Sequence, residues 1–374
     1  MDKNLEQSLK QIIDEQLKKA EALENAKVKI AISGQSGSGK SSIINAIFGE
    51  KVAKVGSVET TFEKKSYTHN GTDFYDLPGC GTKNFPVSTY IKDCDLVSFD
   101  AFIIVTANRF YENDEWLINE MVKAGRPVYV VRSKMDEAII NEKRDNDLDD
   151  KEVYKKVKAN ILESVDGIAV KGIYLIASVE GVKNDFEKLL EDIENSLDET
   201  KKKRFLSDIK PYNKKVLEKK REIAGEIISN RAWLAAANGI NPIPGLDVSV
   251  DITLLINLAK KIRDTFGLDE EQVAYATKNN GTYLTAVKQF AAKFIAREGI
   301  LLLLKRFAVN IGTKEVAKYI PFLGQAIAAG IGYKMTYSFG VELLEEAYDL
   351  AEEILASSAN DASKIFEENN TIMK

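Results

Sequence analysis

Residues 34–41 have the types and the spacing of a loop that binds phosphate. They read Gly-Gln-Ser-Gly-Ser-Gly-Lys-Ser and match the pattern Gly-x-x-x-x-Gly-Lys-Ser/Thr at every defined position. In such a loop glycines let backbone N–H groups converge on phosphate oxygens, the lysine reaches the β- and γ-phosphates, and the last hydroxyl binds Mg²⁺. A glycine-rich turn without a ligand is the plainer alternative. Because the apolar run 28–32 precedes the loop and a helix-like segment follows it, we expect phosphate to be bound by Gly34, Gln35, Ser36, Gly37, Ser38, Gly39, Lys40, Ser41 and Ser42.

A carboxylate and a glycine further along the chain could complete a triphosphate site. Residues 76–79 read Asp-Leu-Pro-Gly and follow a short strand-like run, so they match the pattern Asp-x-x-Gly. Asp76 could hold the Mg²⁺ shell, and the N–H of Gly79 could turn toward a γ-phosphate. Taken alone, the tetrapeptide is also an ordinary turn sequence.

A third motif predicts which base is bound. After the apolar run 128–132, residues 133–136 read Ser-Lys-Met-Asp, close to the guanine-reading pattern [NT]KxD, with serine in the first position. The Asp136 carboxylate could accept hydrogen bonds from both N1–H and the exocyclic amine of guanine, a pair that adenine cannot form. A later strand-like run, 173–176, leads into a turn where the backbone would contact the base. The expected base-binding residues are Lys134, Asp136, Ala177 and Ser178.

The order of strand-like and helix-like runs predicts the layer that positions these motifs. Apolar strand-like runs alternate with helical segments across residues 26–198, at 28–32, 72–76, 101–106, 128–132 and 173–176. This alternation specifies a mostly parallel sheet covered by helices, with the ligand site at the carboxyl ends of the strands, where all three motifs fall. Residues 138–152, rich in Asn, Asp, Glu and Lys, are predicted to be an exposed insertion.

Both ends of the chain predict a helical domain. Residues 199–374 show helical periodicity without strand-like runs, and proline-containing breaks occur at 241–245 and 319–324. Residues 1–25 carry apolar side chains at helical spacing with charges between them. We expect this N-terminal segment to pack with the C-terminal helices, because each alone would leave an apolar face exposed.

Composition limits the function classes. The 374 residues, 44% of them hydrophobic, are enough for two domains with full cores, and the net charge of -5 disfavours a general nucleic-acid binder. Two cysteines, Cys80 and Cys94, and no recognisable secretory signal indicate a cytoplasmic protein. No apolar run is long enough to span a bilayer, and the Met-Asp start lacks the glycine that myristoylation requires, so any membrane contact is expected to be peripheral.

Beyond these motifs, the chain resembles the immunity-related GTPases, the interferon-inducible dynamin-like class. The similarity covers most of the chain and is densest in these segments: 76–86, 102–104, Arg109-Phe110, Asn113-Asp114, 132–136, 56–63, 243–245 and 320–321. The resemblance implies a Ras-like α/β GTPase domain (G domain) and an all-α domain built from both termini. It also implies binding of GDP and GTP, dimerisation through the G domains, cooperative GTP hydrolysis, and action on vacuolar or vesicular membranes.

The resemblance also implies a catalytic set. Position 80, where a Ras-type glutamine would orient the attacking water, is cysteine, so we expect slow intrinsic turnover. Phosphoryl transfer depends mainly on positioning and charge stabilisation, so a partner commonly supplies a missing group. The resemblance places Glu59 at the dimer interface, where it would organise water or nucleotide, and an exposed loop carboxylate is the alternative. Thr61 would bind Mg²⁺ with Ser41 and Asp76, although Thr60 competes for this role. The expected catalytic residues are Lys40, Glu59, Thr61 and Gly79.

Three functions are compatible with these features. The first is a GTP hydrolase, producing GDP and phosphate, that is activated by G-domain dimerisation and couples nucleotide state to a helical effector domain. The second is a slow guanine-nucleotide switch that acts as a regulatory binding module. The third is a membrane-remodelling machine, which the apolar C-terminal helices favour and the missing lipidation signal disfavours. The expected partners are guanine nucleotides, a second copy of the chain in the GTP state, and a peripherally contacted membrane, with no nucleic acid.

Overall fold

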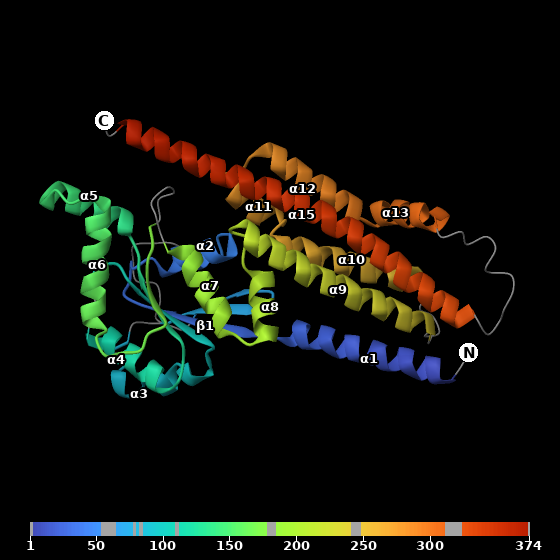
Figure 1. Ribbon diagram of the computed structural model, residues 1–374, viewed down its shortest axis with the longest axis horizontal. Coiled ribbons are helices and arrows are strands. Elements are labelled where there is room, and N and C mark those ends of the chain that lie inside the picture. Colours follow the sequence, from blue (N-terminus) through green and yellow to red (C-terminus); the bar gives the residue numbers. More distant parts are fainter. Residues whose placement is uncertain are drawn as a thin grey trace. The chain divides into compact units, whose positions relative to one another are not determined.

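The protein is described by a computed structural model that covers residues 3–53, 65–77, 80–81, 85–108, 112–177, 185–240, 248–310 and 324–372. By its internal contacts the chain divides into two compact units. One unit comprises Ala26–Asp208 and Ala359–Lys374 and contains the sheet. The other comprises Met1–Asn25 and Ile209–Ser358 and is helical (Figure 1).

The described strands form one sheet in the order β2-β3-β1-β4-β5-β6. The strands are β1 (Val28–Ser33), β2 (Lys65–His69), β3 (Thr72–Asp76), β4 (Ala101–Thr106), β5 (Val128–Arg132) and β6 (Gly172–Leu175). Strand β2 runs antiparallel to β3, and the other neighbouring pairs are parallel. Every residue of β4 and β5 is buried, as expected for central strands with both faces covered. Strand β2 is absent from the expected runs, because its residues alternate between exposed and half-buried positions at the sheet edge.

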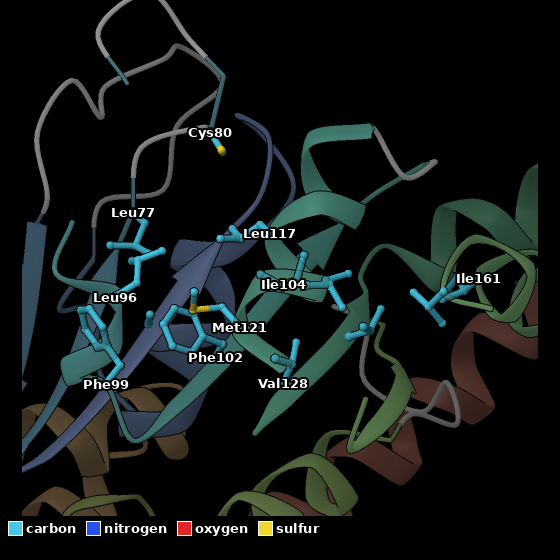
Figure 2. Packing of buried hydrophobic residues seen from close by; sticks show 14 of the residues in the cluster. Leu77, Cys80, Leu96, Phe99, Phe102, Ile104, Leu117, Met121, Val128 and Ile161 are labelled. Atoms are coloured by element: carbon cyan, nitrogen blue, oxygen red, sulfur yellow. The ribbon is translucent and has the colours of Figure 1, made fainter. Parts of the chain in front are cut away.

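Helices from the intervening segments cover the sheet. They are α2 (Lys40–Phe48), α3 (Val87–Asp93), α4 (Glu112–Lys123), α5 (Met135–Asn146), α6 (Asp150–Ser164), α7 (Phe186–Ser196) and α8 (Glu199–Asp208), with a short 3₁₀ helix at Leu96–Ser98. Phe102 and Ile104 of β4 pack with Leu117 and Met121 of α4 in one buried apolar cluster (Figure 2). Cys80 belongs to the same cluster, so the segment after the Asp-x-x-Gly motif is anchored in the core.

The segment 138–152, expected to be an exposed insertion, is mostly exposed and belongs mainly to the helices α5 and α6. An N-terminal capping box, in which Asp149 and Glu152 each accept the other's backbone N–H, starts α6. Lys156 donates to Glu142 across the two helices at 2.8 Å. Charged residues such as Glu and Lys are good helix formers, so the composition indicated exposure without excluding a helix.

Helix α8 belongs to the unit that contains the sheet, so the structural boundary lies at 208–209 and not at the 198–199 position expected from the change of pattern. The buried Arg204 guanidinium donates to both oxygens of the buried Asp208 carboxylate. The same carboxylate accepts the Gly71 N–H at 3.1 Å, at the turn between β2 and β3. Helix α8 therefore contributes a buried ion pair to the sheet-containing unit.

The helical unit is built from two segments, one before and one after residues 26–208 in the sequence. Its helices are α1 (Lys3–Asn25), α9 (Lys214–Ile240), α10 (Val248–Phe266), α11 (Glu270–Ala276), α12 (Gly281–Phe294), α13 (Arg297–Asn310) and the first part of α15 (Gly324–Ile372). Helix α1 lies along α9 (Figure 1), and Arg231 pairs with Glu24 between them. Lys220 of α9 is fully buried and donates to the carbonyls of Ile209 and Thr265, the latter in the last turn of α10. None of the helices in the described parts of the chain is both long and apolar enough to cross a membrane.

Candidate functional site

The loop between β1 and α2 has the backbone conformation of a phosphate cradle. Gly34, Gly37 and Gly39 all have positive φ angles, at 146°, 74° and 93°. A Cβ atom on Gly34 would lie 2.0 Å from the carbonyl oxygen of Val105, so no larger residue fits there without moving the loop or β4. Helix α2 begins at Lys40, directly after Gly39, so its first N–H groups and positive dipole end adjoin the loop.

Lys40 and Asp76 connect the loop to the neighbouring strand. The Lys40 ammonium donates to the carbonyls of Gly34 at 2.8 Å and Gln35 at 3.2 Å, and its Nζ lies 3.7 Å from Asp76 Oδ1. Both side chains are largely buried, with 10% and 5% of their surface exposed. Strands β1 and β3 are parallel neighbours, and Ile32 lies opposite Asp76. The loop after β1 and the Asp76 carboxylate therefore lie together at the carboxyl ends of these strands. This arrangement places a cation and an anion together where a phosphate chain would enter.

Ser133 joins the loop to the segment predicted to read guanine. Its hydroxyl lies 2.5 Å from the carbonyl oxygen of Ser38 and 3.2 Å from that of Thr106, and both are acceptors for its single proton. Its backbone N–H also donates to Thr106 at 2.9 Å. The sequence showed only that serine replaces the usual asparagine or threonine. The structure shows that this serine still links the phosphate loop, β4 and the end of β5.

The rest of this segment is held at the ends of β5 and β6. Lys134 adopts a left-handed conformation, with φ of 55°, and forms the N-cap of α5, so Asp136 lies in the first turn of that helix. The N–H of Met135 donates to the carbonyl of Ile176 at 3.1 Å, which ties this turn to the residues after β6. Ala177 follows directly and is buried. The two segments expected to surround a guanine base are therefore hydrogen-bonded to each other.

Several expected site residues cannot be placed. Glu59, Thr60, Thr61, Gly79 and Ser178 lie outside the described residues. The expected site residues that the structure describes lie at the carboxyl ends of the parallel strands. The phosphate loop and Asp76 lie near β1 and β3, and the Ser-Lys-Met-Asp segment lies near β5 and β6.

Cys80, at the position where a Ras-type glutamine would orient water, has a buried thiol. Burial and the nearby Asp114 carboxylate raise the pKa of Cys80 from 9.0 to about 11. The thiol is therefore protonated at neutral pH and packs in the apolar cluster beside α4. A neutral, buried thiol is poorly suited to hold or activate an attacking water, and slow intrinsic turnover stays a prediction.

Taken together, the sheet topology, the phosphate loop after β1, the aspartate ending β3 and the Ser-Lys-Met-Asp turn after β5 define a Ras-like P-loop GTPase domain. An all-α domain formed by N- and C-terminal helices accompanies it, as the sequence predicted.

Comparison with known proteins identifies the family. The family description Interferon-inducible GTPase (IIGP) matches residues 1–366. Interferon-inducible GTPase 1 of Mus musculus is 33% identical over 264 residues, which cover 66% of this chain and 63% of that protein. Interferon-inducible GTPase 5 of Rattus norvegicus is 26% identical over 351 residues, which cover 88% of this chain and 75% of that protein. The chain belongs to the interferon-inducible GTPase family and is a GTPase by class, which confirms the resemblance seen in the sequence.

Solved structures share a more limited similarity. Toc33 from Arabidopsis thaliana in complex with GDP and Mg²⁺ matches with a TM-score of 0.36 and 15% identity, covering 50% of this chain and 91% of that chain. The G domain of the T. maritima FeoB iron transporter matches with a TM-score of 0.28 and 22% identity, covering 46% of this chain and 98% of that chain. The family assignment rests on the sequence relatives and not on these structures.

Proposed function

We propose that this GTPase binds GDP and GTP with Mg²⁺, hydrolyses GTP to GDP and phosphate, and turns over faster when two G domains associate. The observation that carries the proposal is the contact of Lys40 with both the phosphate loop and Asp76, together with the Ser133 bridge from that loop to the base-reading turn. These contacts support the proposal, because they connect the segments predicted to bind the phosphates and the base. A phosphate chain would compete with the carbonyls of Gly34 and Gln35 for the three N–H donors of Lys40.

The residues present fit a magnesium ion. Mg²⁺ prefers hard oxygen ligands and is usually held by one or two protein groups, phosphate oxygens and water. Asp76 is buried at the end of β3 beside Lys40, and Ser41 lies in the first turn of α2. We assign these two side chains to the Mg²⁺ shell, and Thr61 stays a predicted third ligand. Bound there, Mg²⁺ would neutralise charge on the β- and γ-phosphates.

The remaining catalytic roles would belong to side chains and backbone groups of the protein. The Lys40 ammonium would stabilise negative charge on the transferred phosphoryl group, and backbone N–H groups of the loop would orient it. The buried, protonated Cys80 thiol leaves water positioning to another group. We propose that Glu59 supplies this function when a second G domain is present. The helical domain would respond to the nucleotide state. Peripheral membrane contact stays a prediction from the resemblance, and a cytoplasmic location stays a prediction from the composition.

A second candidate function is a slow switch that binds guanine nucleotide tightly and hydrolyses it negligibly. The Cys80 environment favours this alternative, because the position next to the Asp-x-x-Gly motif offers no water-orienting side chain. The two candidates share a binding site and differ in whether self-association raises the rate.

The test is GTP turnover per enzyme molecule across a wide range of protein concentrations, with Mg²⁺. ATP and the Lys40→Ala variant serve as controls. A rate per molecule that climbs with concentration supports dimer-activated hydrolysis, and Glu59→Ala should then remove the climb. A low, constant rate with tight guanine-nucleotide binding would instead establish the slow switch. Sedimentation with vesicles in GTP and in GDP separately tests membrane contact.

A further inference from the structure

A residue at the start of α7 completes the hydrogen bonding of β6, which lies at one end of the described strand order. The N–H of Leu175, the last residue of β6, donates to Asp185 Oδ2 at 3.0 Å. The N–H of Asp185 donates back to the carbonyl of Leu175 at 2.9 Å. Leu175 is buried, and its backbone groups would be costly to leave without partners. Asp185 therefore supplies the pairing that a terminal strand otherwise lacks.

Asp185 uses its carboxylate for this strand although it is the N-cap residue of α7. An N-cap aspartate ordinarily accepts an N–H from the first turn of its own helix. The Asp185 side chain makes no such bond to α7, and its Oδ2 accepts the Leu175 N–H instead. The carboxylate thus stabilises the end of β6 in place of the start of α7.

The next residue along the chain connects this strand end to the turn assigned to guanine. The N–H of Ile176 donates to the last residue of β5 at 2.8 Å, and the Ile176 carbonyl accepts the N–H of Met135 at 3.1 Å. Met135 is fully buried and directly precedes Asp136 in α5. Because Leu175 and Ile176 are consecutive, a shift of Leu175 also moves the carbonyl that holds Met135.

A tyrosine of α6 gives a second indication that Asp185 and Asp136 are close. Burial raises the pKa of the Tyr154 hydroxyl to about 12, and the carboxylates of Asp185, Asp150 and Asp136 contribute. Interactions between charges weaken with distance, so Asp185 and Asp136 lie within electrostatic reach of the same hydroxyl. The Tyr154 side chain also packs against the apolar cluster that contains Met135.

We propose that Asp185 is a positioning residue for guanine recognition, holding the end of β6 so that Asp136 meets the base. The inference rests on the proposed function, in which Asp136 accepts hydrogen bonds from N1–H and the exocyclic amine of guanine. Without the Asp185 carboxylate, the buried Leu175 N–H loses its acceptor, and the strand end is held less tightly. The phosphates are assigned to a separate loop, so the loss should fall mainly on recognition of the base.

The experiment compares GDP with IDP, whose base keeps N1–H and lacks the exocyclic amine. That amine forms a charge-assisted hydrogen bond with a correctly placed carboxylate, so wild type should bind GDP at least about tenfold more tightly than IDP. Asp185→Ala should lower this preference by about 3- to 10-fold, because a displaced Asp136 loses more contact with guanine than with hypoxanthine. Asp185→Asn keeps an acceptor for the Leu175 N–H and should stay within about twofold of the wild-type preference. Displacement of a fluorescent GDP analogue measures both Kd values.

Two further variants separate positioning from support of the fold. Asp185→Ser removes the carboxylate but keeps a residue that caps helices well, so it should fold and lose the preference even if Asp185→Ala fails to fold. Asp192→Ala is a matched control on α7, because it removes the 2.7 Å bond from the Tyr174 hydroxyl of β6 and leaves the Leu175 pair intact. This control should lower Tm and leave the ratio of Kd for IDP to Kd for GDP unchanged.

Three outcomes would overturn the inference. Equal weakening of GDP and IDP binding in the Asp185 variants would show that this residue only supports the fold. An unchanged preference in Asp185→Ala and Asp185→Ser would show that Asp136 is held without it. The same loss of preference in Asp192→Ala would assign the effect to a general loosening of α7.

Failure of the proposed function has a different signature, because it is seen in the wild-type protein. Wild type that binds IDP as tightly as GDP would refute guanine recognition by Asp136, and this inference with it. Wild type that prefers GDP but does not hydrolyse GTP would refute the hydrolysis proposal, and the ratio of the two Kd values would still decide the role of Asp185.

Discussion

The Ser133 hydroxyl lies 2.5 Å from the carbonyl oxygen of Ser38, a residue 95 positions earlier in the chain. This hydrogen bond joins the loop assigned to the phosphates to the turn assigned to the base. Both oxygens are buried, so neither has water as a ready alternative partner. The bond explains how a serine can occupy a position where asparagine or threonine is usual.

The first prediction concerns this hydroxyl. Ser133→Ala should weaken GDP binding by about 3- to 10-fold, since a hydrogen bond contributes about 0.5–1.5 kcal/mol net and the Ser38 carbonyl would lose its donor. Ser133→Thr keeps the hydroxyl and should bind within about twofold of wild type. Titration of a fluorescent GDP analogue measures both. Equal affinity in wild type and Ser133→Ala would contradict the assigned role.

The second prediction separates two glycines of the phosphate loop. Gly34→Ala places a methyl group 2.0 Å from a backbone oxygen of β4, whereas a Cβ on Gly37 meets nothing within 4 Å. Both have positive φ, so both variants carry backbone strain of about 1–2 kcal/mol, but only Gly34→Ala adds a clash. GDP affinity, measured by calorimetry, should fall more than about tenfold further in Gly34→Ala than in Gly37→Ala. Similar losses in the two variants would argue against the described loop conformation.

The third prediction concerns the buried pair of Arg204 and Asp208. Asp208→Ala leaves the guanidinium buried without its carboxylate and should lower the free energy of unfolding by about 3–5 kcal/mol. Lys201→Ala, which removes a more exposed ion pair from the same helix, should cost less than about 1 kcal/mol. Urea unfolding measures both. If the double variant Arg204→Met/Asp208→Leu recovers most of the loss, the cost comes from the unpaired charge.

The fourth prediction follows from the raised pKa of Cys80. In the folded protein this pKa is about 11, above the value of 9.0 expected for an exposed thiol, so the folded state keeps its proton at pH values where the unfolded chain releases it. The stabilisation is fully present below pH 9 and decreases as the pH rises toward 11. Wild type should therefore lose stability relative to Cys80→Ser across this interval. Urea unfolding of the two proteins in parallel removes the contributions of lysines and tyrosines, and a constant difference would contradict the assigned environment.

The sequence predicted the central strands well and missed one at the edge. The runs that became β1, β4 and β5 are mostly apolar because both faces of the sheet are covered. Strand β2, Lys65–His69, is a short edge strand whose side chains alternate between exposed and half-buried positions, so no apolar run marked it. The composition of the charged segment 138–152 indicated its exposure but not its helices, because a solvated composition is compatible with α5 and α6.

By itself the sequence determined the phosphate loop, the base-reading motif and the order of the elements, since these depend on neighbouring residues and on local backbone preferences. Only the tertiary structure decided which distant residues meet. Asn113 contacts Cys80 across 33 positions, and Gly71 contacts Asp208 across 137. The strand order and the packing of helices bring these partners together, and no local pattern encodes such a contact. The contacts of Asn113 with Cys80 and of Ser133 with Ser38 therefore became visible only in the folded chain, whereas the residues predicted to bind phosphate and base could be named from the sequence.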